Sequence, residues 1–225
     1  MTKIQLPQTT ITFPEIRLQT RDAHKLRGFF GNLFKEHSIL LHNHFQDTGE
    51  FRQGYTLVQY KVLDHIPTLV GLGEGADLLV DLFLKIKHLE IDGHFFEVMA
   101  KNINHSVVDI GLSNSLFEYR FESLWMALNQ NNYRDFIKAT LDEQDIIFNR
   151  ILKNNLLAFL NGMGCQLTIN EPIMCKFSLK KTRETNFKDN KMMGFQGSFM
   201  CNALLPNLIG LGKSVSRGYG TIIKI

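Results

Sequence analysis

The chain has 225 residues, of which 44% are hydrophobic and 21% charged, and its formal net charge is +3 at pH 7. This composition excludes a disordered chain and a collagen-like repeat, and no apolar run approaches the roughly 18 residues that a membrane span needs. Residues 1–10 contain no apolar core of a secretory signal. Cys165, Cys175 and Cys201 are odd in number and too widely spaced for a disulfide framework or a zinc site. We therefore expect a reduced, cytoplasmic protein with no membrane partner.

The first half of the chain alternates between strand and helix patterns. Leu26, Phe29, Phe30, Leu33 and Phe34 recur at helical spacing, which predicts a helix with one apolar face. The expected elements are a strand at 11–19, a helix at 22–36, strands at 55–63 and 66–71, a helix at 74–86 and an extended segment at 89–101. This β-α-β-β-α-β order is typical of the ferredoxin-like module.

The second half repeats the order with one weak element. We expect a strand at 117–125, helix over most of 129–162, strands at 172–181 and 194–202 around a flexible basic stretch at 181–191, and a last strand at 219–225. A short segment, 203–209, stands where the second helix belongs. The predicted fold class is therefore α+β, with two tandem ferredoxin-like (RRM-like) domains at 1–104 and 105–225 and a C-terminal glycine-rich loop.

Charge is distributed unevenly along the chain. Residues 175–225 contain nine Lys and Arg against Glu184 and Asp189, a local balance of +7, so the remaining residues carry −4. Such asymmetry indicates a polyanion-binding region in the C-terminal domain, although a solvated basic hairpin has the same composition.

The segment GLGKSVSRGYG, residues 210–220, imitates two phosphate-binding motifs. A P-loop needs Gly where this chain has Asn207, and too few residues follow Lys213 to build the β-α units of a nucleotide fold. A dinucleotide fingerprint fails because Val215 occupies the place of its third Gly. Neither motif is present.

What remains is a glycine-rich turn with two cations and two hydroxyl groups. Glycines let backbone N–H groups approach a phosphate closely, and Lys and Arg add charge, so the segment suits a nucleic-acid backbone. The alternative is a tight connection before an edge strand. The candidate RNA-binding residues here are Gly210, Gly212, Lys213, Ser214, Arg217, Gly218 and Gly220.

The same loop carries a family resemblance. The pattern of Gly210-Leu-Gly212, five residues, then Gly218-Tyr-Gly220 resembles the signature loop of CRISPR-associated repeat-processing endoribonucleases of the RAMP superfamily. The N-terminal half, with LLHNH followed by YTLVQYK, is similar to the b-type subgroup. The resemblance implies tandem ferredoxin-like domains and cleavage of CRISPR precursor transcripts within their repeats. Because some superfamily members do not cleave RNA, a non-catalytic CRISPR RNA-binding subunit is the alternative.

The resemblance also implies a site after the first helix, where the family commonly has a catalytic His assisted by Tyr or Lys. His42 and His44 suit this place because histidine transfers protons near neutral pH. One takes the proton of a ribose 2′-OH, which attacks the adjacent phosphorus, and the other protonates the departing 5′-oxygen, leaving a 2′,3′-cyclic phosphate. This reaction needs neither a metal nor a cofactor. A metal half-site and an ordinary surface loop are the alternatives for this His-x-His pair.

Three further residues complete the predicted site. Tyr55 is the candidate partner that positions the 2′-OH or assists proton transfer, and Arg52 and Lys61 are candidate phosphate ligands. A half-buried strand aromatic is the alternative for Tyr55, and a solvated face is the alternative for Arg52 and Lys61. No role is expected for His24, His65, His88, His94 or His105. The expected partners are the CRISPR repeat RNA, other subunits of an interference complex and a second copy of the chain.

Overall fold

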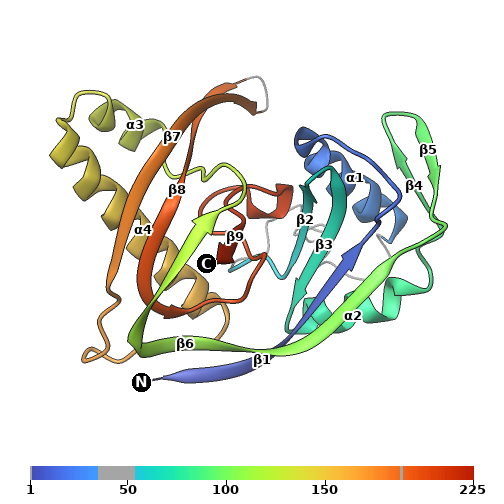
Figure 1. Ribbon diagram of the computed structural model, residues 1–225, viewed down its shortest axis with the longest axis horizontal. Coiled ribbons are helices and arrows are strands. Elements are labelled where there is room, and N and C mark those ends of the chain that lie inside the picture. Colours follow the sequence, from blue (N-terminus) through green and yellow to red (C-terminus); the bar gives the residue numbers. More distant parts are fainter. Residues whose placement is uncertain (1, 35–53, 188–189) are drawn as a thin grey trace, which may run out of the picture. The chain divides into compact units, whose positions relative to one another are not determined.

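The computed structural model describes residues 2–34, 54–187 and 190–225 (Figure 1). They form two compact units. The N-terminal unit combines Gln5–Val108 with Val215–Gly218, and the C-terminal unit combines residues 2–4 with Asp109–Ser214 and Tyr219–Ile225. No helix among the described residues is long and apolar enough to cross a membrane.

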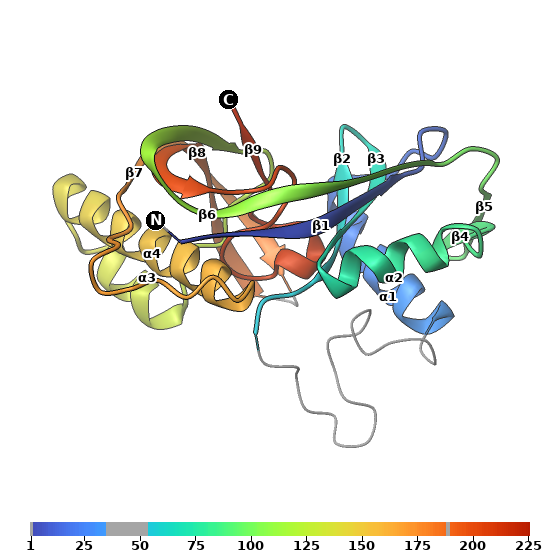
Figure 2. The same ribbon diagram turned by 90° about the horizontal axis from the view of Figure 1, so that it is seen from below.

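The N-terminal unit has the ferredoxin-like order that the sequence predicts. Its elements are β1 (Lys3–Thr12), α1 (Ala23–Leu33), β2 (Val58–Leu63), β3 (Ile66–Leu72), α2 (Glu74–Phe83) and the first part of β6 (Asn102–Phe121). The strands lie in the order β2-β3-β1-β6, with α1 and α2 on the same side of them (Figure 2). The core between these layers includes Ile11, Leu26 and Phe30, which are buried.

The hairpin of β2 and β3 confirms the predicted two-residue link. Asp64 and His65 have φ angles of 48° and 66°, the left-handed pair that a tight hairpin turn requires. The strands then pair in register from Leu63–Ile66 back to Val58–Gly71.

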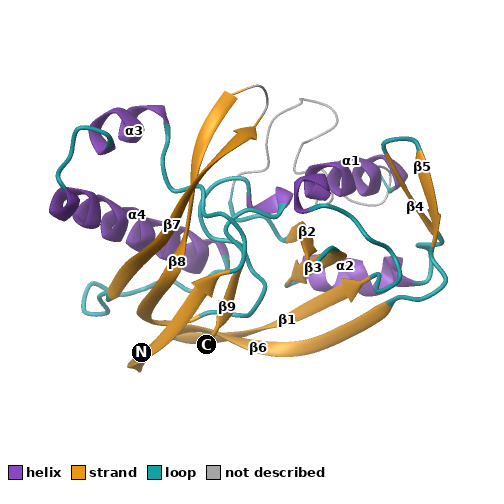
Figure 3. Ribbon diagram, turned by 45° about the horizontal axis from the view of Figure 1, so that its top comes forward, coloured by secondary structure: helices purple, strands orange, loops and turns teal. Residues whose placement is uncertain are grey.

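Two strands of this unit differ from the expectation. The first strand is β1, not residues 11–19, because it ends at Thr12 and Pro14 has no N–H with which to continue a ladder. Residues 89–101 do not supply the fourth strand of the sheet. They contain most of a separate hairpin of β4 (His88–Ile91) and β5 (His94–Glu97), which stands apart from the sheet (Figure 3), and the fourth strand is the first part of β6.

The C-terminal unit repeats the order without its second helix. Its elements are the later part of β6, α3 (Gln130–Phe136), α4 (Leu141–Gly162), β7 (Cys175–Phe187), β8 (Asn190–Leu204) and β9 (Ile222–Lys224). The strands lie in the order β7-β8-β6-β9. Between β8 and β9, where every residue is described, the chain forms only the 3-10 turn η3 (Val215–Arg217). Phe148 of α4 packs against Phe177 and Phe195, with ring centroids 5.2 and 4.8 Å away.

The described part of the basic stretch, residues 181–187 and 190–191, differs from the expected flexible loop. It belongs to strands, because β7 continues through Phe187 and β8 begins at Asn190, with the register running from Lys181–Gln196 to Phe187–Asn190. Backbone pairing forms strands here although the composition alone is typical of a loop.

Candidate functional site

The predicted catalytic histidines are not placed by the structure. His42 and His44, together with Arg52, lie outside the described residues. Their roles stay predictions, and the site is built here from the residues on either side of them.

Tyr55 stands just before β2 and is half-buried. Its hydroxyl oxygen accepts a hydrogen bond of 2.8 Å from Nε2 of Gln59. The same Nε2 also donates to the carbonyl of Thr56 at 3.1 Å. The phenol is therefore held in one orientation by an amide whose own position is set by the backbone.

Lys61 forms a hydrogen bond to the same Gln59 side chain from within the protein. Its Nζ donates a hydrogen bond of 3.0 Å to Oε1 of Gln59, so Tyr55, Gln59 and Lys61 form one hydrogen-bonded chain, called here the Tyr55–Lys61 chain. Lys61 has a relative exposure of 0%, and this burial lowers the pKa of its ammonium to about 7. Lys61 therefore does not lie on a solvated face. A phosphate ligand needs a side chain that solvent can reach, and the ammonium of Lys61 is enclosed.

The glycine-rich loop is a tightly closed connection. Gly210 bridges Thr221, the N–H of Leu211 donates to the Gly220 carbonyl at 2.8 Å, and the N–H of Gly220 donates to the Leu124 carbonyl at 2.9 Å. Gly220 has φ +65°, and a Cβ there would lie 2.0 Å from the Leu211 carbonyl oxygen. The closed loop therefore needs glycine at position 220 whether or not it binds RNA.

The polar residues of the loop are divided between the two units. Lys213 and Ser214 belong to the C-terminal unit, where Lys213 is exposed and its Nζ donates to the Leu128 carbonyl at 3.4 Å. Arg217 and Gly218 belong to the N-terminal unit, not with the rest of the chain after residue 105. A Cβ on Gly218 would lie 3.0 Å from the Ala23 side chain, so η3 sits close against α1.

Arg27 of α1 was missed by the sequence analysis. It is half-buried, and the positive charge of Arg217 adds to the effect of burial in lowering the pKa of the Arg27 guanidinium. Two guanidinium groups near each other favour an anion, which would relieve their repulsion. The only signal in the sequence is that Arg27 lies beside the apolar stripe of its helix; its neighbour comes from a distant part of the chain.

Comparison with known proteins identifies the family. The model of the Cas6b N-terminal domain matches residues 4–109, and that of the Cas6b C-terminal domain matches residues 111–225. The chain belongs to the Cas6b family. This confirms the resemblance to CRISPR-associated repeat-processing endoribonucleases.

Solved structures agree with the Cas6b assignment. A crystal structure of Cas6b is 30% identical with a TM-score of 0.91, and covers 99% of this chain and 100% of its own. A CRISPR RNA processing endoribonuclease, also Cas6b, is 27% identical with a TM-score of 0.77, covering 99% of this chain and 100% of its own. An uncharacterized protein of Methanocaldococcus jannaschii is 27% identical over 145 residues, which is 64% of this chain and 97% of that protein. The tandem ferredoxin-like fold is confirmed.

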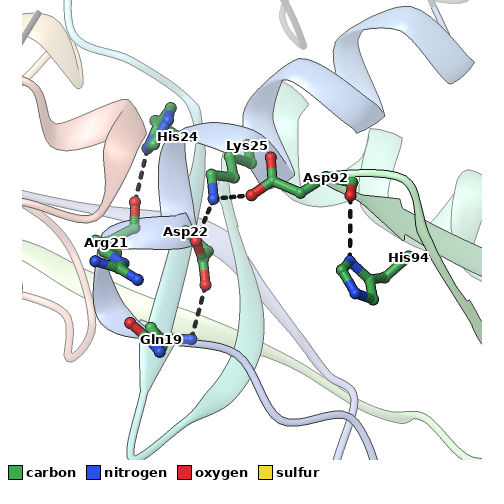
Figure 4. Close-up of polar contacts among 7 residues, drawn as sticks. All are labelled: Gln19, Arg21, Asp22, His24, Lys25, Asp92 and His94. Atoms are coloured by element: carbon green, nitrogen blue, oxygen red, sulfur yellow. Dashed lines mark hydrogen bonds and ion pairs between the residues drawn. The ribbon is translucent and has the colours of Figure 1, made fainter.

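Two of the histidines for which the sequence predicts no role have local structural contacts. Figure 4 shows Nδ1 of His24 donating to the Arg21 carbonyl at 2.7 Å and Nδ1 of His94 donating to the Asp92 carbonyl at 3.2 Å. Lys25 joins these two turns, because its ammonium pairs with both Asp22 and Asp92. These contacts give the two histidines a place in the fold, and no catalytic role is assigned to them.

Proposed function

We propose that this chain is an endoribonuclease that cleaves CRISPR precursor transcripts within their repeats. The observation that carries the proposal is the match of both Cas6b domain models, which together span almost the whole chain. A solved relative described as a CRISPR RNA processing endoribonuclease, 27% identical over 99% of this chain, supports it.

The proposed chemistry is proton transfer. His42 and His44 act as the acid and base: one removes the proton of the 2′-OH, whose oxygen bonds to phosphorus, and the other gives a proton to the departing 5′-oxygen. The products are a 2′,3′-cyclic phosphate and a 5′-hydroxyl. Every proton is accounted for by these two side chains, so the reaction requires no metal or cofactor.

Tyr55 is proposed to position the 2′-OH or to assist the proton transfer. The hydrogen bond from Gln59 to its hydroxyl oxygen supports this role, because it fixes the orientation of the phenol. Lys61 is proposed to act through Gln59 by holding that amide in place, because its ammonium donates to Oε1 of Gln59. Lys61 is thus a positioning residue in this proposal and not a phosphate ligand.

RNA is proposed to contact the glycine-rich loop. The cations Lys213 and Arg217, the Ser214 hydroxyl and the backbone of Gly210 and Gly212 bind phosphates, and Arg27 adds a charge beside Arg217. Gly218 and Gly220 shape the loop instead, because their N–H groups donate to the Val215 and Leu124 carbonyls. In this proposal the domain of residues 1–104 carries the chemistry and that of residues 105–225 carries the basic surface. Arg52 is kept as a phosphate ligand. The protein is expected to act in the cytoplasm, with other interference-complex subunits and a second copy of the chain as further partners.

The first experiment measures cleavage of a cognate repeat RNA in EDTA, beside the same RNA with one 2′-deoxy nucleotide at the cut site. We expect cleavage of the ribose substrate and none of the deoxy substrate, because only the former supplies the attacking oxygen. Tight binding with no cleavage of either would replace the proposal with a non-catalytic RNA-binding subunit. Cleavage abolished by EDTA and restored by a divalent ion would support the metal-dependent alternative.

The His44→Ala variant tests the assignment of the chemistry. Loss of a general acid or base is expected to lower the cleavage rate by about 10²–10⁴-fold while RNA affinity changes little. His42→Ala is expected to act in the same direction, and Tyr55→Phe to lower the rate less. Equal losses of rate and affinity in His44→Ala would assign that histidine to binding instead.

A further inference from the structure

An open groove lies on the C-terminal unit, apart from the residues assigned above. Its volume is about 640 Å³, which is within the range of small-molecule and nucleotide sites. Its polar lining consists of Arg120, Ser178, Lys180, Lys181, Gln196 and Ser198. Three of these six side chains are cations.

The groove lies on the face of the sheet that the helices leave open. Arg120 of β6, Ser198 of β8 and Ser178 of β7 are register partners, so they form one row across three strands. The next row, containing Phe199 and Phe177, is buried and points the other way, toward α4. The polar row is therefore a surface of the sheet and not part of its core.

A bulge in β7 brings two lysines to this surface. Leu179 pairs with Gly197 and Lys181 pairs with Gln196, so Lys180 is an extra residue that no residue of β8 opposes. Such a bulge re-aims the side chains beside it, and here both Lys180 and Lys181 line the groove. Gly197 fits opposite the bulge because a Cβ there would lie 2.1 Å from the Ser178 carbonyl oxygen.

The groove carries a surplus of positive charge. Arg120 pairs with Glu122 at 2.9 Å, whereas neither Lys180 nor Lys181 has a carboxylate partner among the residues that the structure describes. Two lysines side by side repel each other, and a bound anion would offset that repulsion. The serine hydroxyls and the Gln196 amide are further hydrogen-bond donors for the oxygens of such an anion.

We propose that this groove is a second RNA site, which binds a single-stranded segment by its phosphates. This inference rests on the proposed function, which supplies RNA as the ligand. The aromatic residue in the lining, Phe121, is 5% exposed and offers no face on which a base could stack. Recognition here is therefore electrostatic and independent of base sequence, as expected of contacts to the backbone.

The test uses the double variant Lys180→Gln/Lys181→Gln and a single-stranded oligouridine probe, with affinity measured over a series of salt concentrations. Each phosphate contact on a single strand contributes about 0.7 to the slope of log K against log salt. We expect the slope of the variant to be shallower by about 1.4 and its low-salt affinity to be lower by about tenfold. The matched control is Lys138→Gln/Lys153→Gln, which removes the same charge from exposed positions on the helical side.

An affinity and slope equal to those of the control would overturn the proposal and leave the groove as a surface for an acidic protein. Melting curves of both variants show whether the fold is kept. Cleavage of repeat RNA, measured on the same wild-type preparation, separates the two proposals. If the wild type binds oligouridine through Lys180 and Lys181 but cleaves no repeat RNA, the groove proposal stands and the endoribonuclease proposal fails. If the wild type cleaves repeat RNA while both double variants bind oligouridine alike, the endoribonuclease proposal stands and the groove proposal fails.

Discussion

Lys61 shows how one residue can be misread from sequence and still matter to the site. It lies in a strand of alternating residues, where a lysine is typical of a solvent-facing position. In the fold its ammonium is enclosed, and the hydrogen bond described above is to the neutral amide of Gln59. Burial removes water from around the ammonium, which disfavours its charged form.

This burial predicts a pH dependence of stability. Because the pKa of Lys61 is about 7 when folded and about 10.4 when unfolded, the unfolded chain binds more protons between these values. Stability contributed by this residue therefore rises as pH increases through that window, by up to about 1.4 kcal/mol per pH unit. Below the window the penalty for the buried charge is fully present. We expect Lys61→Met to be more stable than the wild type at pH 7 and to lose this dependence, as measured by urea unfolding from pH 7 to 10.

The Lys61→Gln variant is the control for polarity, because it keeps a hydrogen-bond donor at this position without a charge. Parallel pH profiles for the wild type and both variants would contradict this, because they would show that the pKa of Lys61 is the same in the folded and unfolded chains. Since Lys61 acts on Tyr55 through Gln59, a stable Lys61→Met is also expected to lower cleavage by more than it lowers RNA affinity.

At the scale of elements, backbone geometry sets the conformation of the glycine-rich loop. Its closure depends on the hydrogen bonds between Leu211, Gly220 and Leu124. Only a residue without Cβ fits at Gly220, because the position combines a left-handed φ with a close carbonyl oxygen.

A pair of Gly→Ala substitutions tests this. Gly220→Ala places a Cβ 2.0 Å from the Leu211 carbonyl oxygen and is expected to lower the free energy of unfolding by about 3 kcal/mol. Gly28→Ala, in α1, meets nothing within 4 Å and is expected to raise it by up to about 1 kcal/mol. Urea unfolding of the two variants measures both values. Equal stability of Gly220→Ala and wild type would show that the loop is open in solution.

At the scale of the whole molecule, charge is separated along the sequence, with a balance of +7 in residues 175–225. Among the described residues, Lys180 and Lys181 of β7 line the groove, whereas Lys213 and Arg217 belong to the glycine-rich loop, so these four cations lie on separate elements. In the proposals above, the loop and the groove are therefore separable contributions to RNA binding.

The double variant Lys213→Gln/Arg217→Gln tests the contribution of the loop. Removing two phosphate contacts is expected to weaken repeat-RNA binding and to reduce the salt slope by about 1.4. The control, Arg21→Gln/Lys85→Gln, removes one Arg and one Lys from exposed positions. The measurement is the repeat-RNA affinity of both variants over a range of salt concentrations. An unchanged salt slope in Lys213→Gln/Arg217→Gln would show that the loop is not part of the RNA interface.

Periodicity in the sequence by itself determined many of the local elements. The apolar stripe of α1 and the two-residue link at Asp64 and His65 are local signals, and each element formed where its signal lay. The spacing of glycines from Gly210 to Gly220 carried the family resemblance. These features were predictable because they depend on residues close together in the chain.

The tertiary structure alone decided where distant residues meet. The fourth strand of the first module is part of β6 and not residues 89–101, because strand pairing is a choice between remote partners. The same holds for the burial of Lys61, for Arg27 beside Arg217, and for the bulge that aims Lys180 and Lys181 into one groove. Each depends on packing between segments far apart in sequence, and local propensity carries no information about such contacts.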